Sequence, residues 1–179
     1  MKKVLILSSS PRRKGNSETL SREFMKGAHD AGNQTELILL YERKINYCTG
    51  CGTCYNAGKS CPQKDDMQEI LDKMNAADVI VMSTPVYFYT MSAQMKTLID
   101  RCCSEYTKLS NKEFYFITTA AETNKTTLER TVEGFRGFMD CLENATEKGV
   151  IYGTGVWQTG EAENSPWIKE AYHMGKSIL

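Results

Sequence analysis

Short apolar segments alternate with amphipathic segments along the chain. Runs of bulky or β-branched residues, typical of buried strands, occur at residues 4–7, 36–40, 79–82, 114–118 and 150–152. Between them, apolar residues recur every three or four positions, as on one face of a helix. These stripes start at Leu20, Met67, Met91 and Leu128, and Ser165-Pro166 is typical of the start of a last helix. The alternation predicts βαβ crossovers and an α/β fold with a parallel sheet between helix layers.

Residues 41–64 fit neither pattern. This stretch is too long for a plain connection, and long loops in compact domains are usually functional or disordered. No repeat, linker or low-complexity tract interrupts the rest, and 179 residues is about the length of one domain. We therefore expect residues 1–179 to form a single domain, with residues 41–64 as a loop inserted after the second strand.

Charge and hydropathy exclude two classes of partner. The 22 Lys and Arg residues balance 22 Asp and Glu residues, which argues against a broad electrostatic surface for nucleic acid or an anionic membrane. No apolar run approaches the ~20 residues of a membrane-spanning helix. The first run ends at Ser8, which is shorter than the roughly 7–15 residues of a signal-peptide core. We expect a cytoplasmic protein without nucleic-acid or membrane partners.

The first expected strand leads into a loop rich in hydroxyl and basic residues. Its sequence is Ser8-Ser9-Ser10-Pro11-Arg12-Arg13-Lys14-Gly15-Asn16-Ser17, and a helix is predicted to begin there. In open α/β sheets, ligands bind at the carboxyl ends of strands, where helix N-termini direct free N–H groups toward anions. Neither the dinucleotide pattern GxGxxG nor a P-loop is present. The loop favours a phosphate site of another kind, and the alternative is a polar turn with a basic surface.

Two motifs together resemble those of the flavodoxin-like NAD(P)H-dependent FMN reductases. They are Ser10-Pro11-Arg12 with Gly15-Asn16-Ser17, and Ser83-Thr84-Pro85-Val86-Tyr87-Phe88 leading to Ile99-Asp100-Arg101. The resemblance implies a flavodoxin-like, doubly wound five-stranded parallel sheet with helices on both faces. It also implies FMN as cofactor, NAD(P)H as co-substrate and a homodimer or homotetramer.

In this family, the first motif binds the flavin phosphate and the second lies against the isoalloxazine ring. The cofactor-binding residues that the resemblance implies are Ser9, Ser10, Arg12, Asn16, Ser17, Pro85, Val86, Tyr87, Phe88 and Thr119. Rigid aromatic side chains at a strand end also suit a flat cofactor on physical grounds, although they could instead cover the sheet end or a subunit contact. Trp157 is expected to cover the sheet edge or a subunit contact. No catalytic side chain is expected, because the flavin carries the chemistry.

Four of the seven cysteines lie in the 41–64 loop with the spacing C-x2-C-x2-C-x6-C. They are Cys48, Cys51, Cys54 and Cys61. Three cysteines in one tight run, and a last cysteine followed by proline, favour a [4Fe–4S] cluster over the paired knuckles typical of zinc. Zinc and free thiols remain alternatives. The spacing is similar to that of iron–sulfur flavoproteins, a branch of the same group. The other three cysteines, Cys102, Cys103 and Cys141, lie on helical patterns and are expected to be buried small hydrophobic residues.

The predicted function is an FMN-dependent oxidoreductase that takes hydride from NAD(P)H and passes electrons to a small-molecule or protein acceptor. A [4Fe–4S] cluster suits such an enzyme, because a flavin accepts two electrons and can release them singly. Since both loops follow strands, we expect them on the same edge of the sheet. Two alternatives stay open: a flavodoxin-like electron carrier that does not oxidise NAD(P)H, and a redox or metal sensor based on the cysteine loop.

Overall fold

The computed structural model describes residues 1–57 and 59–179. Its centre is a twisted sheet with the strand order β2-β1-β3-β5-β6, in which neighbouring strands along this path are parallel. The bounds are β1 Lys3–Ser8, β2 Gln34–Leu39, β3 Val79–Tyr87, β5 Glu113–Thr119 and β6 Thr146–Gly153. This is the flavodoxin-like order, so the predicted fold class is confirmed. The order reverses between β1 and β3, which is where such folds bind ligands.

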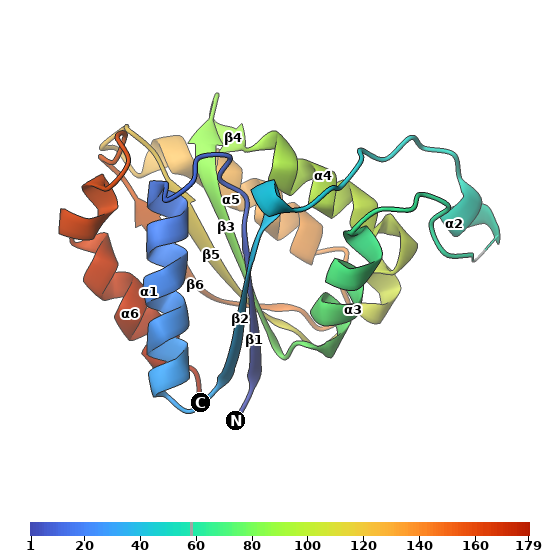
Figure 1. Ribbon diagram of the computed structural model, residues 1–179, viewed down its shortest axis with the longest axis horizontal. Helices are drawn as coiled ribbons and strands as arrows, with labels where there is room; N and C mark the ends of the chain where they lie inside the picture. The colour runs from blue at the N-terminus through green and yellow to red at the C-terminus, as the bar shows by residue number, and fades with distance from the viewer. Residues whose placement is uncertain (58) are drawn as a thin grey trace.

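Helices cover both faces of the sheet (Figure 1). On one face lie α1 (Asn16–Asp30) and α6 (Trp167–Lys176), and on the other lie α3 (Met67–Ala76), α4 (Ala93–Arg101) and α5 (Thr126–Met139). The shorter elements are η1 (Leu40–Glu42), α2 (Thr53–Ala57), η2 (Cys102–Ser104), η3 (Tyr106–Lys108) and η4 (Glu161–Asn164). No helix in residues 1–57 and 59–179 is long and apolar enough to cross a membrane.

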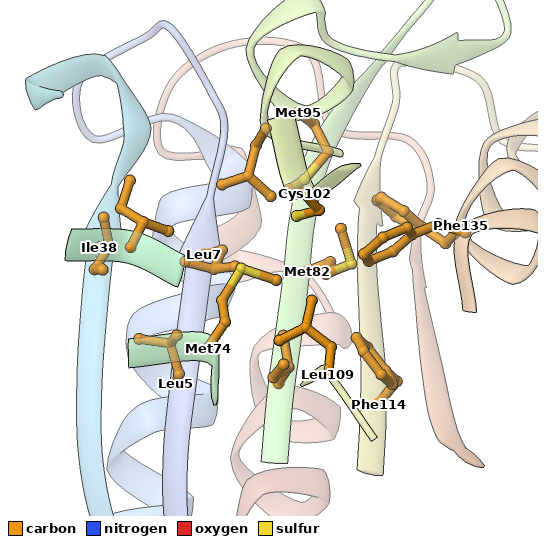
Figure 2. Packing of buried hydrophobic residues seen from close by; sticks show 14 of the residues in the cluster. Leu5, Leu7, Ile38, Met74, Met82, Met95, Cys102, Leu109, Phe114 and Phe135 are labelled. Atoms are coloured by element: carbon orange, nitrogen blue, oxygen red, sulfur yellow. The ribbon is translucent and has the colours of Figure 1, made fainter. Parts of the chain in front are cut away.

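The sheet divides the hydrophobic core into two clusters, because successive strand residues point to opposite faces. Leu5 and Leu7 join the cluster under α3, α4 and α5, whereas Val4 and Ile6 join the one under α1 and α6. Figure 2 shows the first cluster, in which Met82 lies between Leu7 and Met74 on one side and Phe135 on the other. Burial of this apolar surface is the main stabilising term, and it gives a rigid base for the loops at the carboxyl edge.

Two glycines allow α1 and α6 to pack closely. A Cβ atom on Gly27 would collide with the backbone carbonyl of Tyr172, and one on Gly175 would collide with the carbonyl of Phe24. Backbone atoms leave no room to adjust, so any larger residue at either position must push the helices apart. This contact holds α6 against α1, the helix that begins at the end of the β1–α1 loop.

The structure differs from the sequence prediction at the end of β3. The strand continues past Met82 to Tyr87 and turns back into a short antiparallel strand, β4 (Thr90–Met91), which the apolar pattern did not predict. Phe88 and Tyr89 form the turn with positive φ angles of 49° and 64°, as the usual two-residue hairpin turn requires. Asn and Gly are the usual residues for such a turn, and their absence here explains why the hairpin was missed.

Candidate functional site

A cleft opens at the carboxyl edge of the sheet, between the β1–α1 loop, the end of β3 and the segment after β6. Eight of the ten predicted cofactor-binding residues line it: Ser10, Arg12, Asn16, Ser17, Pro85, Val86, Tyr87 and Thr119. They come from three separate strand ends, which the parallel topology brings to one place. The cleft therefore has a polar end at the start of α1 and a more apolar wall at the end of β3.

The β1–α1 loop turns tightly enough to exclude a side chain at Gly15. A Cβ atom there would lie 2.8 Å from Ser10 Oγ and 3.0 Å from the Arg12 carbonyl oxygen. Gly15 is also the N-cap of α1, and no side chain caps this helix end. The first-turn N–H groups of a helix have no partner within the helix, so here they are available to an anion in the cleft.

Ser17 and Thr119 meet on the floor of the cleft. Their hydroxyl oxygens are 2.7 Å apart, and the Ser83 hydroxyl donates to the Ser17 carbonyl oxygen at 3.2 Å. These bonds tie the first turn of α1 to the middle of β3 and the end of β5. A hydroxyl has one donor and two acceptor positions, so each retains capacity for a ligand.

Arg12 and Asn16 connect the β1–α1 loop to the segment after β6. Arg12 Nη1 donates to the Trp157 carbonyl oxygen at 3.0 Å, and its guanidinium lies 5.1 Å from the centre of the Trp157 ring. Asn16 Nδ2 donates to the Gln158 carbonyl oxygen at 3.0 Å, while Asn16 Oδ1 accepts from the Ala162 N–H at 3.1 Å. Asn16 therefore acts on the cleft chiefly by fastening its far wall, and Arg12 places a positive charge at the rim.

Two predicted cofactor-binding residues, Ser9 and Phe88, do not line the cleft. The Ser9 hydroxyl is buried, where it donates to the Ser83 carbonyl oxygen at 3.1 Å and accepts from Ser92 Oγ at 2.9 Å. Phe88 is 100% exposed at the tip of the β3–β4 hairpin. Ser9 therefore supports the loop from below, and Phe88 points away from the sheet into solvent.

The segment after β6 supplies cleft residues that the sequence analysis missed. The missed lining residues are Val156, Trp157 and Thr159 from this segment and Ala120 and Ala121 after β5, while Gly15 belongs to the motif already expected to bind the phosphate. The sequence analysis expected Trp157 at the sheet edge or a subunit contact and did not place it beside Arg12, which its ring and carbonyl oxygen contact at the cleft. A usable signal existed, because Gly155 and Trp157 directly follow the last strand, at the same carboxyl edge.

The loop at residues 41–64, called the cysteine segment below, carries four accessible or partly accessible thiols. Cys48 and Cys51 are exposed, and Cys54 and Cys61 are half-buried. Gly50 and Gly52 adopt positive φ angles of 64° and 73°, which allows tight turns between the cysteines.

As a donor set, four thiols suit an iron–sulfur cluster or zinc. In the described parts of the chain, however, no three Cys, His, Asp or Glu side chains are gathered around one centre. The pKa of Cys51 is lowered, chiefly by a hydrogen bond with the Thr53 side chain.

A buried ion pair fastens the chain on both sides of the four cysteines to α4. Arg101 donates to the two carboxylate oxygens of Asp65 at 2.7 and 3.0 Å, and also to the Asn46 carbonyl oxygen at 2.7 Å. The two charged side chains are only 2% and 1% exposed. The Arg101 hydrogen bond is the main reason that the pKa of Asp65 falls to about 2. Cys61 also interacts with Arg101 and helps to raise the pKa of this guanidinium.

The cysteine segment begins at the carboxyl edge of the sheet but does not stay there. Figure 1 shows it running past α4 to α2, on the side of the molecule opposite α1 and α6. None of its cysteines lines the cleft. The expectation that both loops share one edge is thus met only where the segment starts, and within one chain the cysteines and the cleft are separate features.

The three remaining cysteines do not share one environment. Cys102 is buried as predicted, and burial raises the pKa of its thiol to about 12. The prediction was wrong for Cys103 and Cys141, which are exposed. α4 ends at Arg101 and α5 ends at Met139, so the helical periodicity no longer holds at these two positions.

Comparison with known proteins agrees with this geometry. The family model described as NADPH-dependent FMN reductase matches residues 2–141. An iron–sulfur flavoprotein of Methanocaldococcus jannaschii is 46% identical over 99 residues, which are 55% of this chain and 51% of that protein. Another, from Archaeoglobus fulgidus, is 43% identical over 101 residues, which are 56% of this chain and 45% of that protein. These matches thus span about half the length of the curated relatives.

Solved structures share the fold at low sequence identity. An NAD(P)H:quinone oxidoreductase from Methanothermobacter marburgensis aligns with a TM-score of 0.76 and 17% identity over 98% of this chain and 94% of that one. An azoreductase from Bacillus anthracis aligns with a TM-score of 0.73 and 20% identity over 99% of this chain and all (100%) of that one. The strand order, the cleft at the switch point and the match over residues 2–141 lead to one conclusion. The chain belongs to the NADPH-dependent FMN reductase family.

Proposed function

We propose that this chain binds FMN in the cleft and acts as an FMN-dependent oxidoreductase, which takes hydride from NAD(P)H and passes electrons to a small-molecule or protein acceptor. The observation that carries the proposal is the pairing of an uncapped helix N-terminus with an apolar wall at the switch point of the sheet. Family membership and the names of the iron–sulfur flavoprotein relatives support it. The same reasoning makes residues 1–179 a single FMN-binding domain.

The polar end of the cleft suits the phosphate of FMN. The first-turn amides of α1 and the hydroxyls of Ser10 and Ser17 offer donors, and the helix dipole adds a favourable positive potential. Arg12 contributes a full positive charge at the rim, held in place by the Trp157 carbonyl. Gly15 permits the close approach of backbone that a phosphate requires.

The other end of the cleft suits a flat ring. Pro85, Val86 and Tyr87 form one wall, and their backbone is held by pairing with β5 and β4. Trp157, from the segment after β6, lines the same cleft beside Arg12. When bound there, FMN supplies the hydride and single-electron chemistry, while these side chains bind and orient it.

The cysteine segment is proposed to hold a [4Fe–4S] cluster through Cys48, Cys51, Cys54 and Cys61. The spacing, the all-thiol donor set and the relatives' names support a cluster over zinc or free thiols. Because the segment lies away from the cleft of its own chain, we propose a homodimer or homotetramer as the working assembly.

Anaerobic reconstitution tests both cofactors in one preparation. Protein loaded with FMN, iron and sulfide should show flavin and iron–sulfur absorption, with iron in excess of zinc. Stopped-flow mixing with NADPH or NADH should then bleach the flavin promptly. Reduction by dithionite but by neither nicotinamide would favour an electron carrier, and failure to bind FMN would favour a sensor.

Cysteine variants separate the two sites. Cys51→Ala should lose the iron–sulfur absorption and retain FMN, since none of the cysteines lines the cleft. Cys141→Ala, at an exposed cysteine outside the segment, is the matched control and should retain both. Loss of FMN together with iron in Cys51→Ala would contradict the separation of the sites.

A further inference from the structure

A fifth thiol lies beside the cysteine segment. Cys103 is on η2, directly after α4, and α2 of the cysteine segment packs against η2. Cys54, from α2, and Cys103 line the same surface hollow, together with Lys59 and Glu105. Cys103 lies outside the C-x2-C-x2-C-x6-C series and is separated from its last cysteine by α3, β3, β4 and α4. The fold, not the local sequence, brings this thiol to the segment.

The shared hollow, and the packing of α2 against η2, set Cys103 apart from the other exposed cysteine outside the segment. Cys141 is equally classed as exposed, but its thiol donates to the Gly137 carbonyl oxygen at 3.4 Å and does not line this hollow. Exposure alone therefore does not distinguish Cys103; its cysteine neighbour does.

We propose that Cys54 and Cys103 form a disulfide when the cysteine segment holds no metal, by exchange with a small-molecule disulfide of the glutathione type. One protein thiolate attacks a sulfur of the small disulfide, whose S–S bond breaks and releases one small thiol. The second protein thiolate then attacks the protein sulfur of this mixed disulfide and releases the other small thiol. The two cysteines together lose two protons and two electrons, and the small disulfide gains both.

The pair has a consequence for the metal site, and this part rests on the proposed function. Cys54 belongs both to the proposed cluster ligands and to the disulfide pair. Metal ligation requires its thiolate, and a sulfur in a disulfide is no longer one. Cluster binding and the Cys54–Cys103 disulfide therefore exclude each other, and the disulfide would tie α2 to the end of α4.

The first experiment needs no cluster. Full-length protein, treated with a chelator and reduced, is equilibrated with glutathione disulfide, alkylated and digested without reductant for mass spectrometry. The expected main product is a peptide pair joined through Cys54 and Cys103. A main linkage of Cys54 to Cys48 or Cys51 would overturn the proposal, as would a glutathione adduct on Cys103 without any internal linkage.

Matched variants sharpen the result. Cys103→Ser should abolish the linked pair and leave glutathione on Cys54, whereas Cys141→Ser should leave the linked pair unchanged. Circular dichroism of both variants checks the fold, and the linkage map of the unaltered protein stands even if a variant fails to fold.

The second experiment repeats the exchange on iron-loaded protein. The linked pair should fall by about tenfold or more, because Cys54 is then held as a ligand. An undiminished linked pair in iron-loaded protein would overturn the mutual exclusion. A chain that takes up no iron but forms the linked pair would support the disulfide and contradict the cluster part of the proposed function.

Discussion

Replacing Asp65 by Asn tests how the cysteine segment is anchored. The carboxylate is 1% exposed and accepts both hydrogen bonds from the buried Arg101 guanidinium. Asn has nearly the same shape but no charge, so Asp65→Asn leaves the guanidinium buried without its counter-charge. Arg101 Nε already has no hydrogen-bond partner among the described residues, which limits any compensation within the site.

Two arguments give the size of the stability loss in Asp65→Asn. The pKa of Asp65 falls from 3.8 to about 2 on folding. This difference corresponds to ~2 kcal/mol of stability at neutral pH. Removing one partner of a buried ion pair commonly costs ~3–5 kcal/mol, because the other charge is left uncompensated. The free energy of unfolding of Asp65→Asn should therefore be lower by ~2–5 kcal/mol at pH 7.

The effect should depend on pH in one direction. Since the folded-state pKa lies below the unfolded value, the contribution is complete above the unfolded value of 3.8 and is lost as the pH falls through about 2. The charge-dependent part of the difference between wild type and Asp65→Asn should shrink from ~2 kcal/mol at neutral pH to ~1 kcal/mol near pH 3.

Urea denaturation followed by circular dichroism at several pH values measures both effects. Asp66→Asn is the matched control, because the neighbouring Asp66 carboxylate accepts only an exposed bond from the Lys44 N–H among the described residues. That variant should lose less than ~1 kcal/mol. Equal losses in the two variants, or a difference that does not change between neutral and acidic pH, would refute the role given to the Asp65–Arg101 pair.

Three further predictions concern the fold and the cleft. Gly27→Ala should lower the free energy of unfolding by ~2–4 kcal/mol, because its Cβ collides with the backbone of α6. Gly137→Ala, with open space around its Cβ, should raise the free energy of unfolding by ~0.5–1 kcal/mol. Equal changes in the two variants, measured by thermal and urea denaturation, would contradict the close packing of α1 on α6. Gly15→Ala should weaken FMN binding by about tenfold or more through displacement of Ser10 and Arg12, and unchanged affinity in a fluorescence titration would count against the tight loop. Arg12→Gln should weaken binding of FMN but not of riboflavin, and an equal loss for both would place Arg12 away from the phosphate.

The fold was largely predictable because burial imposes a period on the sequence. The strand predicted at residues 79–82 is buried on both faces of the sheet, and the apolar stripe that starts at Met67 is buried against it. The β3–β4 hairpin was not predictable, since Phe88 and Tyr89 adopt positive φ angles without the Asn or Gly that usually mark them.

The cleft was predictable where its residues are local and less so where they depend on distant contacts. Eight of the ten expected residues line it, and the β1–α1 loop does so through backbone geometry that Gly15 permits. Asn16 lines the cleft, and its amide also bonds to Gln158 and Ala162, more than 140 residues away; Trp157 enters the cleft through a distant contact of the same kind, with Arg12. Periodicity carries no information on such pairings.

Comparing the affinities for FMN and riboflavin tests the central claim most directly. The two ligands share the ring and differ in the phosphate, which is the group assigned to the start of α1, Ser10 and Arg12. Titration of flavin-free protein, followed by quenching of flavin fluorescence, should give an affinity for FMN about 100-fold or more above that for riboflavin. Equal affinities, or no binding of either ligand, would contradict the assignment of this cleft as the FMN site.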